Sequence, residues 1–314
     1  MGERVVIGID GGGTKTEAVI MDASGHVRGS GLAGSSNHNN VGAEAAGLAL
    51  RQVCQQALDQ AGATFSDVMA ICLCLAGAGR PHDRELVAKF VRAIHDFPRV
   101  IIHTDAVGAL AAGTGRLLGL VLIAGTGTIA LGYDRSGRSA RAAGYGALLA
   151  DYGGGFWIGM DALHAIVCAA DGRGPATALT ERVLGHLGLA APDGLVAWTY
   201  GQAFGWQRFA ALAPLVSEAA SAGDAVALDI LNGAAHHLAD SALAVVRRLD
   251  LQDEPFDLVL SGSVWQAGEL VQAPLRAAVL AAAPHAHFLL PTRTPAVGAA
   301  LLAWEEVCRG TNRA

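Results

Sequence analysis

The sequence lacks three features that would point to nucleic acid, a membrane or secretion. It has no excess of positive charge, since 22 Lys and Arg residues stand against 28 Asp and Glu residues and give a net charge of −6. Its longest apolar runs, at 68–79 and 117–127, fall well short of the roughly 20 residues that span a bilayer. It begins directly with a strand-like segment in place of a signal peptide. We therefore expect a cytoplasmic protein that binds neither nucleic acid nor membranes.

Paired cysteines are also missing. The five cysteines are odd in number and include no Cys-x-x-Cys spacing, so neither a disulfide framework nor a cysteine metal site is predicted. The simplest interpretation is a set of buried, reduced thiols. The sequence also has no low-complexity linker, which predicts that its parts pack closely around a cleft. The cysteines are Cys54, Cys72, Cys74, Cys168 and Cys308.

The sequence does contain enough apolar residues for a large core, and it repeats one order of predicted strands and turns. With 314 residues, of which 52% are hydrophobic, it is long enough for two domains. Residues 5–30 contain an apolar strand, a Gly-rich turn, a second strand, a tight turn and a third strand, and residues 120–145 repeat this order. Apolar spacing predicts helices at 42–62, 83–94, 157–170, 176–187, 206–222, 224–248, 269–283 and 294–309, a strand leading into a helix at 99–115, and strands at 67–79 and 256–262. The repeat predicts two domains of similar α/β fold.

Each half has a turn of glycine and threonine, at Gly11–Lys15 and Gly125–Thr128. The first lacks the Walker spacing and the helix that follows a Walker loop, and the second fits Gly-x-Gly-x-x-Ala but precedes a strand-like segment where the dinucleotide fingerprint requires a helix. Glycines let backbone N–H groups converge on an anion, and threonine hydroxyls can donate to it. One such turn is most simply a plain hairpin. Two at matching places predict phosphates held from both sides.

Five segments in order carry a resemblance to a known family. They are GIDGGGTKTEAVI (8–20), HTDAVGALAAG (103–113), IAGTGTIALG (123–132), GYGALLADYGGGFWIG (144–159) and LSGSVW (260–265). Over nearly its whole length the chain resembles the sugar kinase–Hsp70–actin superfamily, and within it the N-acetylglucosamine kinase branch of the BadF/BadG/BcrA/BcrD ATPase family. The resemblance implies two actin-like (ribonuclease H-like) domains, each with a mixed five-stranded sheet flanked by helices, and a cleft between them. It places the domains at 1–117 and 118–294, with the C-terminal helix 295–314 packing back on the first.

The resemblance also assigns roles to residues. The implied cofactors are ATP and Mg²⁺, with Asp10 holding the metal through water. The implied ATP-binding residues are Gly11, Gly12, Gly13, Thr14, Lys15, Gly125, Thr126, Gly127, Thr128, Gly262 and Ser263. The implied sugar-binding residues are Asn37, His38, Asp105, Gly144, Tyr145, Gly146 and Asp151.

Asp105 matches the catalytic base of the family, and its setting supports that role independently. It ends an apolar strand and precedes a helix, where a side chain can point into a cleft. In phosphoryl transfer a carboxylate accepts the proton of the attacking hydroxyl. The alternative is a structural role as a helix N-cap.

Three positions depart from the pattern of the animal N-acetylglucosamine kinases. Asn39 replaces a tryptophan, Ile129 an asparagine, and Tyr152 a glutamate. These departures leave the kinase interpretation intact and the choice of sugar open.

The function predicted from the sequence is ATP-dependent phosphorylation of a hexosamine, N-acetylglucosamine or glucosamine, at the 6-hydroxyl by a homodimer. One alternative is an ATPase that activates a radical acyl-CoA dehydratase, although such activators hold an iron–sulfur cluster with paired cysteines. The other is a sugar-sensing regulator without catalytic activity.

Overall fold

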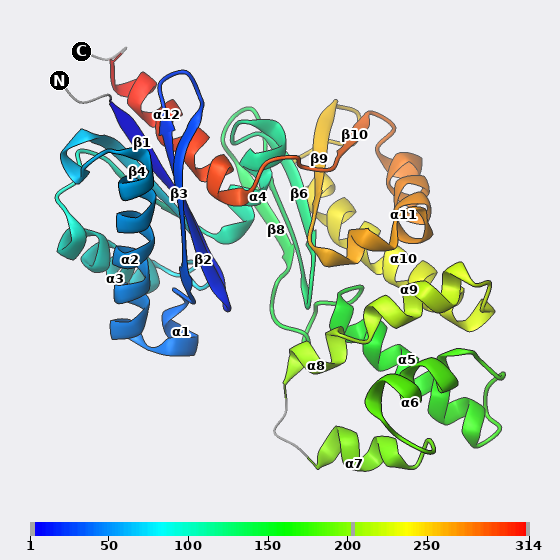
Figure 1. Ribbon diagram of the computed structural model, residues 1–314. Coiled ribbons are helices and arrows are strands. Elements are labelled where there is room, and N and C mark those ends of the chain that lie inside the picture. The colour runs from blue at the N-terminus through cyan, green and yellow to red at the C-terminus, as the bar shows by residue number, and fades with distance from the viewer. Residues whose placement is uncertain (1–3, 202–204, 312–314) are drawn as a thin grey trace. The chain divides into compact units, whose positions relative to one another are not determined.

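The computed structural model describes residues 4–201 and 205–311, which form two compact units (Figure 1). Unit 1 comprises residues 1–119 and 289–314, and unit 2 comprises residues 120–288. Residues 1–3, 202–204 and 312–314 belong to the ranges predicted as domains but lie outside the described residues. Each unit has its own five-stranded sheet and its own hydrophobic core.

The sheet of unit 1 has the strand order β3-β2-β1-β4-β5. Strand β1 pairs antiparallel with β2 and parallel with β4, and both β1 and β4 are buried along almost their whole length. Central strands of this kind are nearly continuous apolar runs, which is the pattern that the sequence shows. The elements are β1 Val5–Gly11, β2 Lys15–Asp22, β3 Val27–Gly34, α1 His38–Val41, α2 Ala43–Ala61, β4 Val68–Leu75, α3 Pro81–Ile94, β5 Val100–His103, α4 Asp105–Thr114 and α12 Pro295–Thr311.

The C-terminal helix α12 packs against β1, β4 and α4 in unit 1. The approach of α12 to β1 is close enough to require glycine in the strand. A Cβ at Gly8 would lie 2.2 Å from the carbonyl oxygen of Ala296 and 2.2 Å from the nitrogen of Ala300. Helix α12 is therefore packed tightly against the first strand of the chain.

Unit 2 repeats this plan with more helices. Its sheet has the order β10-β9-β6-β7-β8, with β6 parallel to β9 and β7 antiparallel to β8. Its elements are β6 Gly119–Ala124, β7 Thr128–Tyr133, β8 Ser139–Ala143, α5 Gly155–Ala170, α6 Leu179–Leu187, α7 Gly194–Tyr200, α8 Trp206–Ala210, α9 Ala213–Ser221, α10 Ala225–Arg248, β9 Phe256–Ser261, α11 Glu269–Ala282 and β10 Ala286–Leu289.

The two sheets share one topology, because β6 to β10 occupy the positions that β1 to β5 hold in unit 1. The repeat extends to the turn after the second strand. Asp22 and Asp134 each accept hydrogen bonds from the N–H groups two and four residues later and from a serine hydroxyl, which belongs to Ser24 or Ser136. The serine hydroxyl is the largest of the interactions that lower the pKa of each aspartate to about 2. The predicted fold class, two similar five-stranded α/β domains, is confirmed.

Three local predictions differ from the structure. The helix expected at 206–222 is two helices, α8 and α9, because Pro214 has no N–H and is accepted only in the first turn of a new helix. Helix α7 and strand β10 were not expected from the sequence. Both are short, so neither contains enough residues to show a hydrophobic period.

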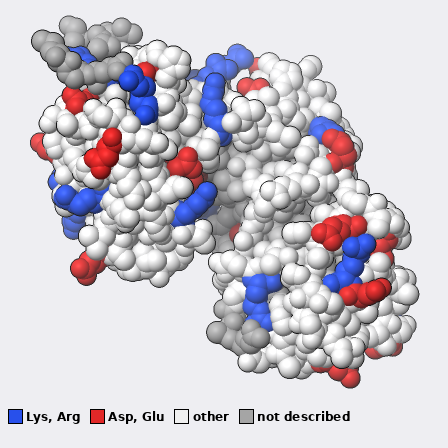
Figure 2. Space-filling view, in the orientation of Figure 1, with Lys and Arg blue, Asp and Glu red and all other residues white. Residues whose placement is uncertain are grey.

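On the face that Figure 2 shows, acidic and basic side chains lie scattered among uncharged residues and do not gather into a single charged patch. Among the helices of the described residues, none combines the length and the hydropathy needed to cross a bilayer.

Candidate active site

The first glycine turn, Gly11–Lys15, joins β1 to β2 and is closed by a hydrogen bond from the N–H of Gly12 to the carbonyl of Lys15 (2.9 Å). Neither Gly11 nor Gly13 adopts a positive φ angle, so the backbone conformation is not what requires them. A Cβ at Gly11 would lie 2.2 Å from the hydroxyl of Ser36, and a Cβ at Gly13 would lie 2.9 Å from the amide of Asn40. These two glycines therefore make room for the loop that follows β3.

That loop, Ser35–Val41, is hydrogen-bonded directly to the first glycine turn. The Ser35 hydroxyl donates to the carbonyl of Gly12 (3.0 Å), and the side-chain amide of Asn40 donates to the carbonyl of Gly13 (3.5 Å). The predicted sugar residue Asn37 is the N-cap of the short helix α1, where its side-chain oxygen accepts the N–H of Asn39.

The second predicted sugar residue of the loop, His38, is fixed by α3. Its Nε2 lies 3.1 Å from Oδ1 of Asp83, a buried carboxylate that also lies 2.9 Å from Nε2 of His82. The other oxygen of Asp83 accepts the N–H of Arg80 at the start of α3. Asp83 thus anchors one side of the loop to a helix, while Ser35 and Asn40 anchor the other side to the glycine turn.

Unit 1 has two carboxylates with raised pKa values, and the charge of one, Asp105, acts on the other, Asp10. Asp10 lies near the end of β1, and Asp105 is the first residue of α4, two residues after the end of β5. Burial, then the charges of Asp105 and Glu17, raise the pKa of Asp10 to about 7, while Lys15 acts in the opposite direction. Burial also raises the pKa of Asp105, against the effect of hydrogen bonds from backbone N–H groups. Because both carboxylates gain from a nearby cation, the pair is suited to receiving positive charge or a proton.

The structure does not support the alternative role of Asp105 as an N-cap side chain. The N-cap of α4 is Thr104, and the Asp105 carboxylate accepts the N–H of the adjacent Ala106 (3.0 Å) in the first turn. Asp105 is partly exposed, so its carboxylate is not sealed inside the core.

The second glycine turn, Gly125–Thr128, joins β6 to β7 in unit 2. The N–H of Gly125 donates to the carbonyl of Gly127 (2.9 Å), which makes the turn tight. Two N–H groups at the start of α5, those of Gly155 and Phe156, donate to the carbonyls of Gly125 and Thr126 (2.7 and 3.0 Å). A strand follows the turn, as expected, so the turn is not a dinucleotide fingerprint.

Asp151 connects the second glycine turn to the segment Gly144–Gly146. Its Oδ1 accepts the N–H groups of Gly144 (3.0 Å) and Tyr145 (3.1 Å). A Cβ at Gly127 would lie 2.4 Å from Oδ2 of Asp151, so the carboxylate packs closely against the turn. Gly144 and Gly146 have φ angles of 71° and 95°, which explains why this segment contains glycine. Asp151 therefore holds two predicted site segments together.

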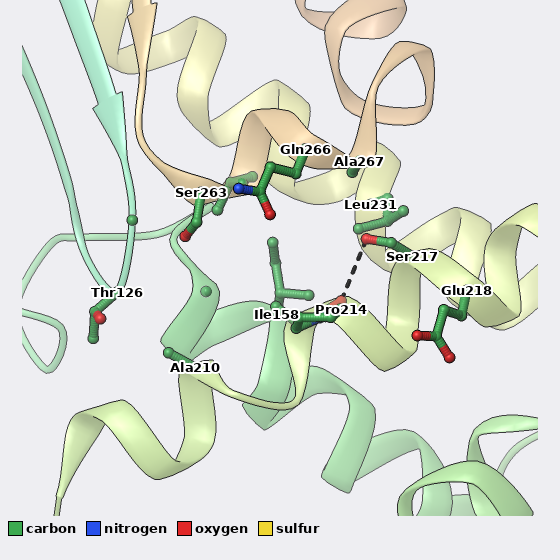
Figure 3. Close-up of a pocket in the computed structure, with 14 residues that line it drawn as sticks. Thr126, Ile158, Ala210, Pro214, Ser217, Glu218, Leu231, Ser263, Gln266 and Ala267 are labelled. Atoms are coloured by element: carbon green, nitrogen blue, oxygen red, sulfur yellow. Dashed lines mark hydrogen bonds between the residues drawn. The ribbon is translucent and has the colours of Figure 1, made fainter. Parts of the chain in front are cut away.

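A cavity of about 300 Å³ opens beside the second glycine turn (Figure 3). Thr126 lies at one end of it and Ser263 on its wall, Ile158 and Pro214 give it an apolar floor, and Leu231 lies beside Ser217 at the side away from Thr126 (Figure 3). The cavity is lined by Gly125, Thr126, Gly155, Ile158, Ala210, Ala213, Pro214, Ser217, Glu218, Leu231, Ser263, Val264, Gln266 and Ala267. An apolar cavity with a few polar groups at its edge is typical of a small-molecule site.

Gly262 is needed where β9 ends beside this cavity. Its φ angle is 108°, and a Cβ there would lie 2.3 Å from the carbonyl oxygen of Ala124 in β6. The glycine lets β9 approach the residue that precedes the second glycine turn. Ser263 follows at once and is exposed at the cavity.

A second cavity of about 420 Å³ is also lined by Thr126. Thr126 lines both cavities, and Gly127 and Asp151 line the second alone. The second cavity is lined by Thr126, Gly127, Tyr145, Gly146, Ala147, Leu148, Leu149, Asp151, Trp206 and Gln207. One threonine is thus shared by the linings of two cavities.

The structure brings several predicted residues together within each unit. In unit 1 the glycine turn meets the loop that carries Asn37 and His38, and Asp10 lies within electrostatic reach of Asp105. In unit 2 Asp151 joins Gly127 to Tyr145. The sequence analysis missed the side chains that line the first cavity from helices, namely Ile158, Pro214, Ser217, Glu218 and Gln266. Ile158 lies within the segment 144–159 but was assigned no role there, and the other four lie outside the five segments and look like ordinary helix residues in the sequence.

All five cysteines are free thiols. Cys54, Cys72 and Cys74 are buried, Cys168 is partly exposed and Cys308 is exposed. The prediction that all five are buried is therefore wrong for Cys308, which lies on α12 near the C-terminus. Within the described ranges 4–201 and 205–311, no three side chains of His, Cys, Asp or Glu are placed to hold a metal.

The two adjacent glycines of the first turn give a matched test of this geometry. Gly11→Ala is expected to destabilise the protein by about 1–3 kcal/mol, because its Cβ would collide with Ser36 and with Leu75. Gly12→Ala is expected to change stability by no more than about 0.5 kcal/mol, since its Cβ would meet its nearest neighbour at an ordinary 3.6 Å. Thermal unfolding of the two variants checks this, and equal losses would contradict the packing described here.

Comparison with known proteins places the chain in a family. The BadF/BadG/BcrA/BcrD ATPase family matches residues 7–303. An N-acetyl-D-glucosamine kinase of Dictyostelium discoideum is 37% identical over 96% of this chain and 98% of its own length. An N-acetylmuramic acid/N-acetylglucosamine kinase of Clostridium acetobutylicum is 34% identical over 83% of this chain and 85% of its own. The crystal structure of a candidate N-acetylglucosamine kinase of Chromobacterium violaceum has a TM-score of 0.74 and 30% identity, covering 96% of this chain and 99% of its own. The chain belongs to the BadF/BadG/BcrA/BcrD ATPase family, as the resemblance in its motifs predicts.

Proposed function

We propose that this protein is an ATP-dependent kinase that transfers a phosphoryl group to the 6-hydroxyl of a hexosamine, N-acetylglucosamine or glucosamine. The observation that carries the proposal is the position of Thr126, which lines both a nucleoside-sized apolar cavity and a second cavity beside it. A phosphate chain held at this threonine would have its nucleoside on one side and an acceptor on the other. The names of the similar proteins agree with a hexosamine as acceptor.

In this proposal the first cavity takes the nucleoside of ATP. Its apolar floor suits an adenine ring, and the polar side chains of Ser217, Glu218, Ser263 and Gln266 at its edge can bond to the base and the ribose. The turn Gly125–Thr128 holds phosphate oxygens through the N–H groups of Thr126 and Gly127 and the hydroxyl of Thr126, because the N–H of Gly125 and the hydroxyl of Thr128 donate to the carbonyls of Gly127 and Tyr152. In unit 1, Gly11–Lys15 has the same role, and Lys15 adds a positive charge.

The proposed base is Asp105. Its carboxylate accepts the proton of the 6-hydroxyl as the oxygen of that hydroxyl bonds to the γ-phosphorus, and the bond to the β-phosphate oxygen breaks to release ADP. Burial raises the pKa of Asp105, which makes the carboxylate a better proton acceptor. Asn37 and His38 in unit 1 and Gly144, Tyr145, Gly146 and Asp151 in unit 2 are the proposed sugar contacts.

The site also fits Mg²⁺. Magnesium keeps several of its waters and is commonly held by one or two carboxylates together with substrate phosphates, so a complete protein cage is not required. Asp10 is the residue that would hold it, because burial and the charges of Asp105 and Glu17 raise its pKa to about 7 and Lys15 offsets this only in part. When bound, the ion supplies positive charge that offsets the negative charge of the phosphates.

The proposal is tested by measuring ADP release against a panel of glucosamine, N-acetylglucosamine, N-acetylmuramate, glucose and no sugar. We expect release to depend on a hexosamine and the product to be its 6-phosphate. A rate that no sugar changes would favour an ATPase instead, and sugar binding without ADP release would favour a sensor. Light scattering of the same preparation tests the homodimer that the family resemblance implies.

A further inference from the structure

We propose that Ser35 and Asn40 are positioning residues that join the sugar-contacting loop to the first glycine turn, so that sugar and nucleotide bind cooperatively. The proposal rests on the function proposed above, in which Asn37 and His38 contact the sugar and Gly11–Lys15 contacts the phosphates. It adds a physical connection between these two contacts, and that connection lies entirely within unit 1.

The connection consists of two hydrogen bonds and two close approaches. Ser35 and Asn40, at the two ends of the loop, donate to consecutive carbonyls of the turn, those of Gly12 and Gly13. The absent Cβ atoms of Gly11 and Gly13 leave the space that Ser36 and Asn40 fill. Loop and turn are therefore in van der Waals contact as well as hydrogen-bonded, so a displacement of one is transmitted to the other.

The loop has little structure of its own to hold it in place. Its only helix, α1, spans four residues, which is far too short to be stable by itself. The side-chain oxygen of Asn37 is engaged in capping this helix, and His38 is tied to Asp83. The position of the sugar contacts thus depends on the ties at the edges of the loop, and Ser35 is one of them.

Ser36 provides an internal control for Ser35. Its hydroxyl is buried beside Gly11, and among the described residues it has no hydrogen-bond partner. Ser35 and Ser36 are therefore adjacent serines in the same loop, of which one is bonded to the glycine turn and the other only packs against it. Removing each hydroxyl separates the hydrogen bond from the packing.

Ser35→Ala removes two hydrogen bonds, the one that the hydroxyl donates to Gly12 and one that it accepts from the N–H of Asn37 (3.2 Å), and only the first joins the loop to the turn. The expected size of the effect follows from this first bond. An intramolecular hydrogen bond contributes on the order of 1 kcal/mol, which corresponds to about a fivefold change in an equilibrium constant. Cooperativity between two ligands is reciprocal, so the factor by which the sugar strengthens nucleotide binding equals the factor by which the nucleotide strengthens sugar binding. Loss of the Ser35 bond is expected to lower this factor about fivefold.

The test measures the dissociation constant of a non-hydrolysable ATP analogue with Mg²⁺, by calorimetry, with and without saturating N-acetylglucosamine and, separately, glucosamine. The variants are Ser35→Ala, Asn40→Ala, Ser35→Thr, which keeps a hydroxyl, and Ser36→Ala. We expect the cooperativity factor to fall about fivefold in Ser35→Ala and to fall in Asn40→Ala, and to stay near the wild-type value in Ser35→Thr and Ser36→Ala. Melting temperatures of the unliganded proteins show that each variant is folded.

Several outcomes would overturn the proposal. An unchanged factor in both Ser35→Ala and Asn40→Ala, an equal fall in Ser36→Ala, or no cooperativity in the wild type would each overturn the connection alone. Failure of the wild type to bind the ATP analogue would overturn the proposed function, and this inference with it. The two failures are thus distinguishable, because only the second abolishes nucleotide binding by the wild type.

Discussion

Asp105→Asn is expected to lower kcat for sugar phosphorylation by about 10²- to 10⁴-fold, which is the usual contribution of a general base. Asparagine has nearly the same shape, and its side-chain oxygen can still accept the N–H of Ala106 in the first turn of α4. It cannot accept the proton of the sugar hydroxyl. The variant should therefore fold normally and bind nucleotide with near wild-type affinity while losing turnover. Single-turnover measurements of sugar phosphate formation separate these effects.

The matched control for this variant is Asp59→Asn, which makes the same chemical change on the exposed side of α2. It is expected to leave kcat unchanged. The pH profile adds a second readout. Because burial raises the pKa of Asp105, the acidic limb of kcat/KM should lie at higher pH than the ordinary value of 3.8 for an aspartate. Near-normal turnover by Asp105→Asn would show that another group, or water, takes the proton.

Much of the fold could be predicted because its signals are local and repeated. The apolar strands of residues 5–30 and 120–145 each contain a complete strand, turn, strand, turn, strand unit, and the structure has these strands in the same order in both sheets. Helix α2 could be placed because its apolar period ends at Gly62, which adopts the left-handed conformation that favours glycine. Such features need no knowledge of distant parts of the chain.

The elements that were missed depend on distant contacts. Strand β10 has only four residues and lies at the edge of its sheet beside β9, so pairing, rather than its own sequence, determines it. The division of 206–222 into α8 and α9 could have been found from Pro214, which is compatible with a helix only near its beginning.

The glycine turns show the same limit at the level of the site. From the sequence, their glycines were interpreted as making room for phosphate. In the structure Gly11, Gly13 and Gly127 also make room for protein side chains, those of Ser36, Asn40 and Asp151. Ser35 and Asn40 appeared in the sequence only as parts of an ordinary polar loop. Their importance depends on which carbonyls they reach, and no single-sequence pattern gives that.

Asp10→Asn is expected to stabilise the unliganded protein while reducing its kinase activity. In the folded protein the pKa of Asp10 is raised from 3.8 to about 7, first by burial and then by the charges of Asp105 and Glu17. An acid with a raised pKa destabilises the folded state whenever it must be ionised. A shift of this size corresponds to about 2–4 kcal/mol after allowance for solvent screening. Asparagine removes that penalty, together with the charge that would hold Mg²⁺.

The pH dependence gives this prediction its sign. Below pH 3.8 Asp10 is protonated in both the folded and the unfolded state, so the substitution should change stability little. Between pH 3.8 and about 7 the unfolded chain releases the proton that the folded protein retains, and the wild type loses stability as the pH rises. The gain in free energy of unfolding of Asp10→Asn over the wild type should therefore grow from pH 4 to pH 7 and then level off, as measured by urea unfolding at pH 4, 5.5 and 8.

The control variant Asp59→Asn, at an exposed position, should show no such growth. A loss of stability in Asp10→Asn, or a gain independent of pH, would mean that the charge of Asp10 is already stabilised in the unliganded protein. The assignment of Asp10 as the carboxylate that holds the metal would then be wrong.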